Sequence, residues 1–250
     1  MDVDTDIGGP LNRFPVTSHS AIIAAASDDA NVRERALETI VASYWKPAYK
    51  YLRIKWQTSN EDAKDLTQGF FTTAIEKGYF AGYDAAKASF QTFFRTCLDR
   101  FVANQKKSEQ RLKRGAGADH LSLDFAGAES ELANNLPAAE LTAEDFFHHE
   151  WVRSLFTLSV ESLEKRYEQT GREIQFKIFE LYDLQESVDS KISYASLANE
   201  FGLKTTDVTN YLAAARRDFR RILLEKVREL TGTEAEYQAE VRALLGIDVK

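Results

Sequence analysis

The residues best suited to binding chemistry lie in the C-terminal third of the chain, between Tyr194 and Arg221. Gly202 stands where a sharp turn between two helices needs a positive φ, which glycine adopts at least cost. Side chains that can bond to base edges or phosphates follow this turn: Lys204, Thr205, Thr206, Asp207, Thr209, Asn210, Arg216, Arg217 and Arg220. The spacing predicts a helix-turn-helix, whose second helix enters the major groove of DNA, although a plain pair of packed helices shares this pattern.

A second basic segment lies in the middle of the chain, from Arg95 to Arg114. It holds seven basic residues against Asp99 and Glu109, a local excess of five positive charges in a chain of net charge −7. The residues expected to hold nucleic acid here are Arg95, Arg100, Asn104, Lys106, Lys107 and Arg111. A local basic patch is typical of nucleic-acid binding, and the alternative is a solvated helix face.

Aromatic residues come before and within this basic segment. They are Tyr79, Phe80, Tyr83, Phe90, Phe93, Phe94 and Phe101. Their helical spacing predicts that most of them belong to a hydrophobic core. The loop at 83–89 is the better place for an exposed contact with an unpaired base, because an aromatic face can stack on any base.

Residue types that form active sites or metal centres do not gather into a convincing set. His148 and His149 are adjacent, so that one helix cannot direct both to the same metal ion. Cys97 falls on the apolar face of its helix, which favours a core position over a nucleophile. The sequence also lacks a phosphate-binding loop of the GxxxxGK type. We therefore expect no catalysis, no metal and no cofactor.

Helical periodicity dominates the chain and predicts an all-α fold of two helical domains joined by a flexible linker. Helices are expected at 30–44, from Pro47 to 56, from Ser59 to Gly78, from Phe90 to about Gly115, and at 234–245. The expected organisation is an irregular segment at 1–19, a first helical domain at 20–114, a linker at 115–145, a helix-turn-helix domain at 146–230 and a helical extension at 231–250.

Composition limits the class of protein. A single cysteine excludes an intrachain disulfide and favours a reducing compartment. No apolar run approaches the roughly 18 residues that a membrane span needs. The acidic start of the chain, Met1-Asp2-Val3-Asp4, lacks the basic residues of a signal peptide. We expect a soluble cytoplasmic protein without a membrane partner.

Three segments in this order resemble the two-domain bacterial RNA polymerase sigma factors of the extracytoplasmic-function type. The segment from Glu61 to Phe71, EDAKDLTQGFF, resembles the acidic stretch that contacts the clamp helices of the polymerase β′ subunit. FQTFFR, from Phe90 to Arg95 and on to Lys107, resembles the part that melts and reads the −10 promoter element. The segment from Tyr194 to Arg221 resembles the domain that reads the −35 element.

The resemblance implies a non-enzymatic role in transcription initiation. Core RNA polymerase and promoter DNA would be the partners, and the polymerase contacts would come from Glu61, Asp62, Asp65 and Gln68. Two other interpretations stay open. One is a helix-turn-helix regulator that binds DNA as a dimer without polymerase. The other is a structural or interaction protein, in which the basic segment only solvates a helix.

The sequence departs from the family pattern in the acidic stretch. Lys64 stands where the family has Glu, and Thr67 follows one helical turn later, so that the two are expected to be neighbours on the helix surface. A phosphate on Thr67 would add about −1.5 to −2 charges and restore the lost acidity. Thr67 is thus the candidate phosphorylation site of a Ser/Thr kinase, and an anti-sigma factor is the other possible regulator. The alternative is that Thr67 is a partly buried helix residue and Lys64 a tolerated change.

Two further departures concern DNA reading. Arg100 and Asn104 replace an Asn and an Asp that are common in the family, so that no base preference follows from the resemblance. Tyr211 and Ala214 stand where arginine is frequent, which leaves fewer phosphate contacts.

Overall fold

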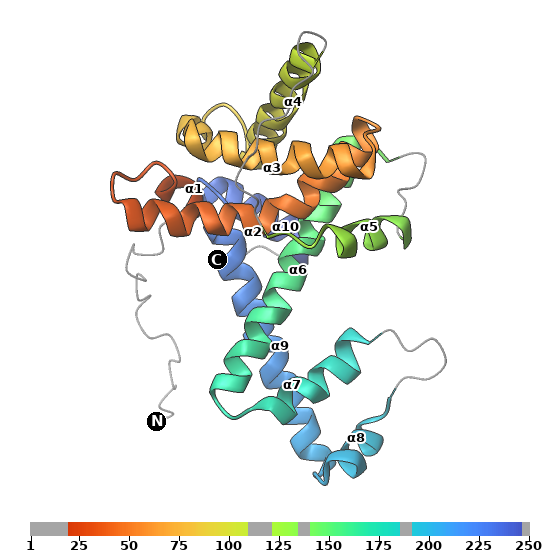
Figure 1. Cartoon of the computed structure of the whole chain (residues 1–250). Helices are drawn as coiled ribbons and strands as arrows, with labels where there is room; N and C mark the ends of the chain where they lie inside the picture. The colour runs from red at the N-terminus through yellow and green to blue at the C-terminus, as the bar shows by residue number, and fades with distance from the viewer. Residues whose placement is uncertain (1–19, 110–121, 135–140, 186–191, 247–250) are drawn as a thin grey trace, which may run out of the picture.

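A computed structural model describes residues 20–109, 122–134, 141–185 and 192–246, and the regular elements in these ranges are all helical (Figure 1). They are α1 (Ala21–Ala24), α2 (Ala30–Lys55), α3 (Asn60–Glu76), the 3-10 helix η1 (Tyr79–Gly82), α4 (Phe90–Glu109), α5 (Phe125–Asn134), α6 (Ala143–Gln169), α7 (Glu173–Phe179), the π-helical turn η2 (Glu180–Leu184), α8 (Tyr194–Phe201), α9 (Thr205–Glu229) and α10 (Glu234–Leu245). This confirms the predicted all-α class for the described residues. The segment 1–19 and Arg111 lie outside them.

Several helix ends were predicted correctly from capping residues and glycines next to them in the sequence. The Ser59 hydroxyl accepts a hydrogen bond from the Asp62 backbone nitrogen at 3.1 Å, which caps α3 as expected. Gly202 follows α8 with φ 65°, as predicted from its place between two helices. α10 has the predicted bounds, and the Thr233 side chain caps its first turn.

α2 is one continuous helix, and the prediction that a new helix begins at Pro47 is wrong. Pro47 lies inside α2, although a proline inside a helix removes one backbone hydrogen bond and costs about 3 kcal/mol or more. Residues of α2 that come before and after Pro47 are buried, among them Tyr44, Ala48 and Leu52. Tertiary packing of this part of α2 therefore outweighs the local preference of proline.

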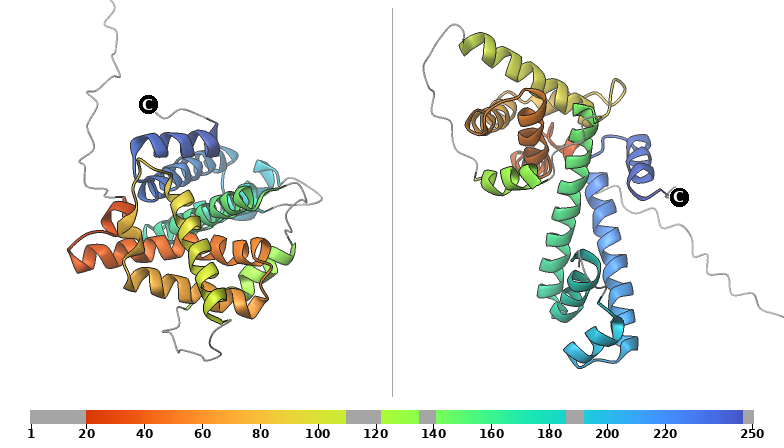
Figure 2. Two further views of the ribbon diagram at one scale, coloured as in Figure 1. Left: turned by 90° about the horizontal axis from the view of Figure 1, so that it is seen from above. Right: turned by 90° about the vertical axis from the view of Figure 1, so that its right-hand side faces the viewer.

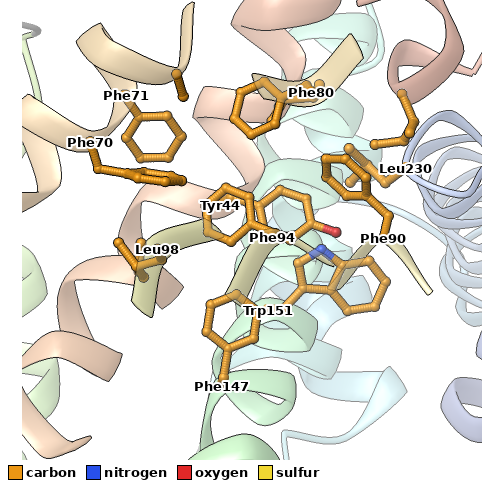
Figure 3. Close-up of a cluster of buried hydrophobic side chains, with 14 of the residues drawn as sticks. Tyr44, Phe70, Phe71, Phe80, Phe90, Phe94, Leu98, Phe147, Trp151 and Leu230 are labelled. Atoms are coloured by element: carbon orange, nitrogen blue, oxygen red, sulfur yellow. The ribbon is translucent and has the colours of Figure 1, made fainter. Parts of the chain in front are cut away.

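The first hydrophobic core contains many aromatic side chains, most of which come from α2, α3, α4 and α6. The Tyr44 ring of α2 stacks on Phe94 of α4, with centroids 4.6 Å apart. Phe147 and Trp151 reach the same cluster from α6, as Figure 3 shows. Most of the aromatic residues that precede the basic segment are thus core residues, as their spacing predicted.

A second, smaller core lies at the far end of α6 and α9, against α7 and α8. Both long helices contribute to both cores: α6 places Trp151 in the first and Tyr167 in the second, and α9 places Val227 in the first and Val208 in the second. At 1.5 Å per residue α6 is about 40 Å long. The two cores are therefore joined by continuous helices that run side by side (Figure 1).

The expected linker at 115–145 contains a helix that the sequence analysis missed. α5 buries Phe125, Ala128 and Leu132, and α6 begins inside the expected linker, at Ala143. Glu129 of α5 binds Arg53 of α2 at 2.7 Å. These contacts attach α5 to the first core, so that the prediction of a flexible linker is wrong for α5 and for the start of α6.

Within the described ranges, none of the helices combines the length and the apolar character needed to cross a lipid bilayer.

Candidate nucleic-acid interface

The first turns of α3 present an acidic surface to solvent. Glu61, Asp62 and Asp65 are exposed, and Gln68 is half-buried. Lys64 lies among them and its Nζ binds Glu61 at 2.8 Å. The acids therefore share one exposed helix segment, as predicted, and Lys64 neutralises part of their charge.

Thr67 does not lie on this exposed surface. Its side chain is fully buried, and its hydroxyl donates a hydrogen bond to the Ala63 carbonyl oxygen at 2.7 Å. Thr67 belongs to the buried face of α3 together with Phe70 and Phe71. The expectation that Thr67 and Lys64 are surface neighbours is wrong, because the helix turns Thr67 toward the core.

A cavity of about 560 Å³ lies where the end of α3, η1 and α4 meet. Its lining combines aromatic, polar and basic side chains with two small residues. They are Thr73, Lys77, Tyr79, Gly82, Phe93, Cys97, Arg100, Phe101, Asn104 and Gln105. Aromatic contacts were expected in this region, but a cavity could not be predicted from the sequence because three separate elements form its walls.

Cys97 is half-buried and lines this cavity, so that its predicted place in the core is only partly correct. Burial raises the pKa of the Cys97 thiol, and Arg100 opposes this rise. The thiol is therefore protonated at neutral pH, which does not favour a nucleophile.

The basic residues of α4 face in different directions. Arg100 and Asn104 line the cavity and are exposed. Lys106 and Lys107 are exposed further along, and Lys106 Nζ lies 4.8 Å from the centre of the Trp56 ring. The Arg95 guanidinium instead lies over the Phe147 ring, at 5.8 Å. Arg95 is therefore separated from the predicted set, whereas Arg100 and Asn104 are together.

The loop at 83–89 joins η1 to α4 beside this cavity. Its residues from Asp84 to Lys87 are exposed, as expected for a contact with an unpaired base. Tyr83 is half-buried, and its ring packs against Phe90 and Phe93, with centroid distances of 5.2 and 5.5 Å. The loop thus starts from an aromatic cluster that continues into the cavity wall.

The second group of predicted residues lies at the start of α9. Thr205, Thr206, Thr209 and Asn210 are exposed there, as is Lys204 just before the helix. The Asp207 carboxylate accepts a hydrogen bond from the Lys204 backbone nitrogen at 3.1 Å, which completes a capping arrangement. Asp207 therefore stabilises the start of α9, a structural role that the sequence analysis did not assign.

The three predicted arginines of α9 are all exposed but differ in their contacts. Arg216 makes a two-pronged contact with Asp183, at 2.9 and 2.8 Å. Arg217 and Arg220 are exposed and line a groove of about 310 Å³ between α9 and α10. Arg216 was expected to contact a DNA phosphate, and in this structure a carboxylate of the protein takes that place.

No protein-family model, curated protein or solved structure matches this chain.

Proposed function

We propose that this chain is a promoter-recognition factor of the sigma type. It would bind core RNA polymerase, recognise −35 and −10 elements and help to open the promoter. The observation that carries the proposal is the cavity between α3, η1 and α4, where aromatic Tyr79 and Phe93 lie beside exposed Arg100 and Asn104. Aromatic faces that stack on bases, next to cations that hold the backbone, are what an unpaired strand needs.

The size of the cavity supports this assignment. About 560 Å³ falls within the roughly 300–1,000 Å³ that is usual for small-molecule pockets. A single base turned out of a duplex is smaller than most such ligands, so that a base and part of its sugar can enter. Arg100 and Asn104 carry side chains that bond to phosphate and to base edges.

α3 offers a connection between polymerase binding and strand reading. Its first turns carry the exposed acids Glu61, Asp62 and Asp65, and Thr73 near its other end lines the cavity. Carboxylates bind basic partner side chains through charge-assisted hydrogen bonds, which are about twice as strong as neutral ones. A polymerase bound to the first half of α3 would thus lie beside the strand-reading cavity.

The α8–α9 pair supports a separate contact with duplex DNA. Thr205, Thr206, Thr209 and Asn210 are exposed where α9 begins, and Leu197 and Val208 are buried between the two helices. Small polar side chains at the start of a helix are the usual readers of base edges in a helix-turn-helix. Arg217 and Arg220 add positive charge further along the same helix.

Control by a Ser/Thr kinase remains part of the proposal in a restricted form. A kinase must reach the Thr67 hydroxyl, which is buried and bonded to Ala63. Modification of Thr67 therefore requires a local opening of α3. The added phosphate would then be displaced from the buried face toward Lys64 and the exposed acids.

The acidic surface of α3 supplies the experiment. Asp62→Ala combined with Asp65→Ala should weaken binding to purified core polymerase about a hundredfold or more, because each of the two lost charge-assisted bonds is worth about 1.5–3 kcal/mol. The matched control is Glu34→Ala with Glu38→Ala, which removes two exposed acids of α2. Equal affinity of both variants for the polymerase would contradict the proposal, and DNA binding without polymerase binding would favour an independent regulator.

A further inference from the structure

The C-terminal helix α10 is bound to both ends of the loop between η1 and α4. The Glu236 carboxylate accepts a hydrogen bond from the Phe90 backbone nitrogen at 2.7 Å and another from the Tyr83 hydroxyl at 3.1 Å. Tyr83 comes immediately before residues 84–89, and Phe90 immediately after them. One carboxylate from the other end of the chain therefore fixes the distance between the two ends of the loop.

Other contacts hold Glu236 in this place. The Gly232 backbone nitrogen donates to the same carboxylate at 2.7 Å, and Tyr237 and Val241 are buried on the face of α10 that meets the first core. α10 folds back beside the end of α9, which Figure 2 shows from two directions. A Cβ at position 232 would lie 2.6 Å from the Tyr83 ring, so that a larger residue there would require this ring to move.

The loop that Glu236 holds is connected to the cavity wall. The Tyr83 ring packs on Phe93 with centroids 5.5 Å apart, and Phe93 and Gly82 both line the cavity. None of the residues that line this cavity belongs to α10, and Asp84 to Lys87 stay exposed while α10 is docked. α10 therefore supports the loop and the wall from behind and leaves their outer surfaces open.

We propose that Glu236 is a positioning residue for single-strand recognition, which acts through Tyr83 and Phe90 to hold the 83–89 loop and Phe93 at the cavity. The inference rests on the proposed function, because it assigns α10 to the part that would read the −10 strand. It gives the C-terminal helix a role in specificity. Glu236 itself need not touch the nucleic acid.

The test compares single-stranded with duplex DNA. The full chain, assembled with core RNA polymerase, is titrated with fluorescent random-sequence single strands and with random-sequence duplexes of the same length. Glu236→Ala should lower single-strand affinity about tenfold, since the hydrogen bonds of a charged group are lost, and leave duplex affinity unchanged. The matched control is Glu234→Ala on the same helix, whose carboxylate binds Arg228 and Gln238 and should change neither affinity.

A second variant separates positioning from folding. Tyr83→Phe keeps the ring and removes only the hydroxyl that binds Glu236. It should therefore lower single-strand affinity less than Glu236→Ala does, and it should also leave duplex affinity unchanged. The double variant should bind single strands no more weakly than Glu236→Ala alone, because the two groups act as a unit. If thermal unfolding shows that Glu236→Ala does not fold, Tyr83→Phe alone provides the comparison.

The outcomes distinguish this inference from the function on which it rests. An unchanged preference for single strands in both Glu236→Ala and Tyr83→Phe, with normal polymerase binding, overturns the positioning role alone. An equal loss of single-strand and duplex affinity also overturns it, because that result indicates a general structural defect. Failure of the wild-type chain to assemble with core polymerase, both unmodified and phosphorylated on Thr67, overturns the proposed function, and the inference falls with it.

Discussion

Lys50 of α2 and Glu150 of α6 form a buried ion pair, in which Nζ lies 2.5 Å from Oε2 and the side chains are 1 % and 5 % exposed. Glu131 of α5 binds the same Lys50 nitrogen at 2.8 Å, and Arg153 binds the other oxygen of Glu150. The pair therefore joins the first core to the long helix that continues into the second core. Both charged groups are buried away from water, so that each is stabilised mainly by its ion-pair partners.

Lys50→Met should destabilise the protein by about 3–5 kcal/mol, because it leaves the Glu150 carboxylate buried without its main cation. Urea denaturation measures the change. The control is Lys64→Met, which breaks the more exposed pair with Glu61 and should cost no more than about 1 kcal/mol. Similar losses for the two variants would show that the Lys50 pair is more hydrated than the structure indicates.

Arg217→Ala with Arg220→Ala should reduce the salt dependence of duplex binding. Each lost phosphate contact lowers the slope of log K against log salt by about 0.9, so that the pair should lower it by about 1.8. Arg216→Ala should leave the slope nearly unchanged, since Arg216 is already bound to Asp183. Fluorescence anisotropy over a range of salt concentrations gives both slopes. A larger effect of Arg216 than of the other two would mean that Asp183 releases Arg216 to the DNA.

The docking of α10 should depend on pH through Glu240. Burial, and then the charge of Glu236, raise the pKa of the Glu240 carboxyl to about 7. Because this pKa lies above the ordinary value of a glutamate, the contribution of Glu240 to the stability of the protein is complete at acidic pH. It is lost as the pH rises through about 7. Glu240→Gln should therefore raise the unfolding temperature relative to wild type at pH 8 and less so at pH 5.

Other groups near Glu240 titrate as well, so that the quantity compared at each pH is the difference in unfolding temperature between variant and wild type. Gln91 of α4 donates to Glu240 at 3.0 Å and contacts His148 of α6 at 3.2 Å. Burial lowers the pKa of His148, which gives it a pH dependence of the opposite sign. Glu234→Gln is the control, because Arg228 lowers the pKa of Glu234. An equal pH profile of wild type and Glu240→Gln would contradict the prediction.

Phosphorylation of Thr67 should loosen α3. A phosphate cannot remain beside Ala63 in the core, so that the phosphorylated chain should exchange its α3 amide hydrogens faster than the unmodified chain. Lys64→Glu should give partial transcription activity without any kinase, since it restores an acid directly. Full activity of the unmodified wild-type chain with core polymerase would contradict the switch and leave Thr67 as a buried helix residue.

The features that the sequence predicted well are those set by neighbouring residues. The Ser59 cap, the positive φ of Gly202 and the bounds of α10 depend on side chains within one or two turns. Pro47 inside α2 and the buried Thr67 were missed because tertiary packing decides both.

The candidate sites show the same division. The sequence was sufficient to identify residue types that could bind acids, bases and phosphates. Two of the predicted residues, Arg100 and Asn104, do lie together at one cavity. The pairing of Arg216 with Asp183, 33 residues away, could not be predicted from the sequence. Nor was the contact between Glu236 and Phe90, which lie 146 residues apart in the chain. Such contacts depend on how the helices are arranged in space.

The decisive experiment is transcription by core RNA polymerase from a library of random DNA fragments, followed by sequencing of the RNA 5′ ends. A promoter-recognition factor should produce start sites that appear only when this chain is added and that share two sequence elements upstream. These start sites should disappear with the Asp62→Ala and Asp65→Ala double variant. An unchanged set of start sites, with or without the chain and in both its phosphorylated and unmodified forms, would contradict the proposed function.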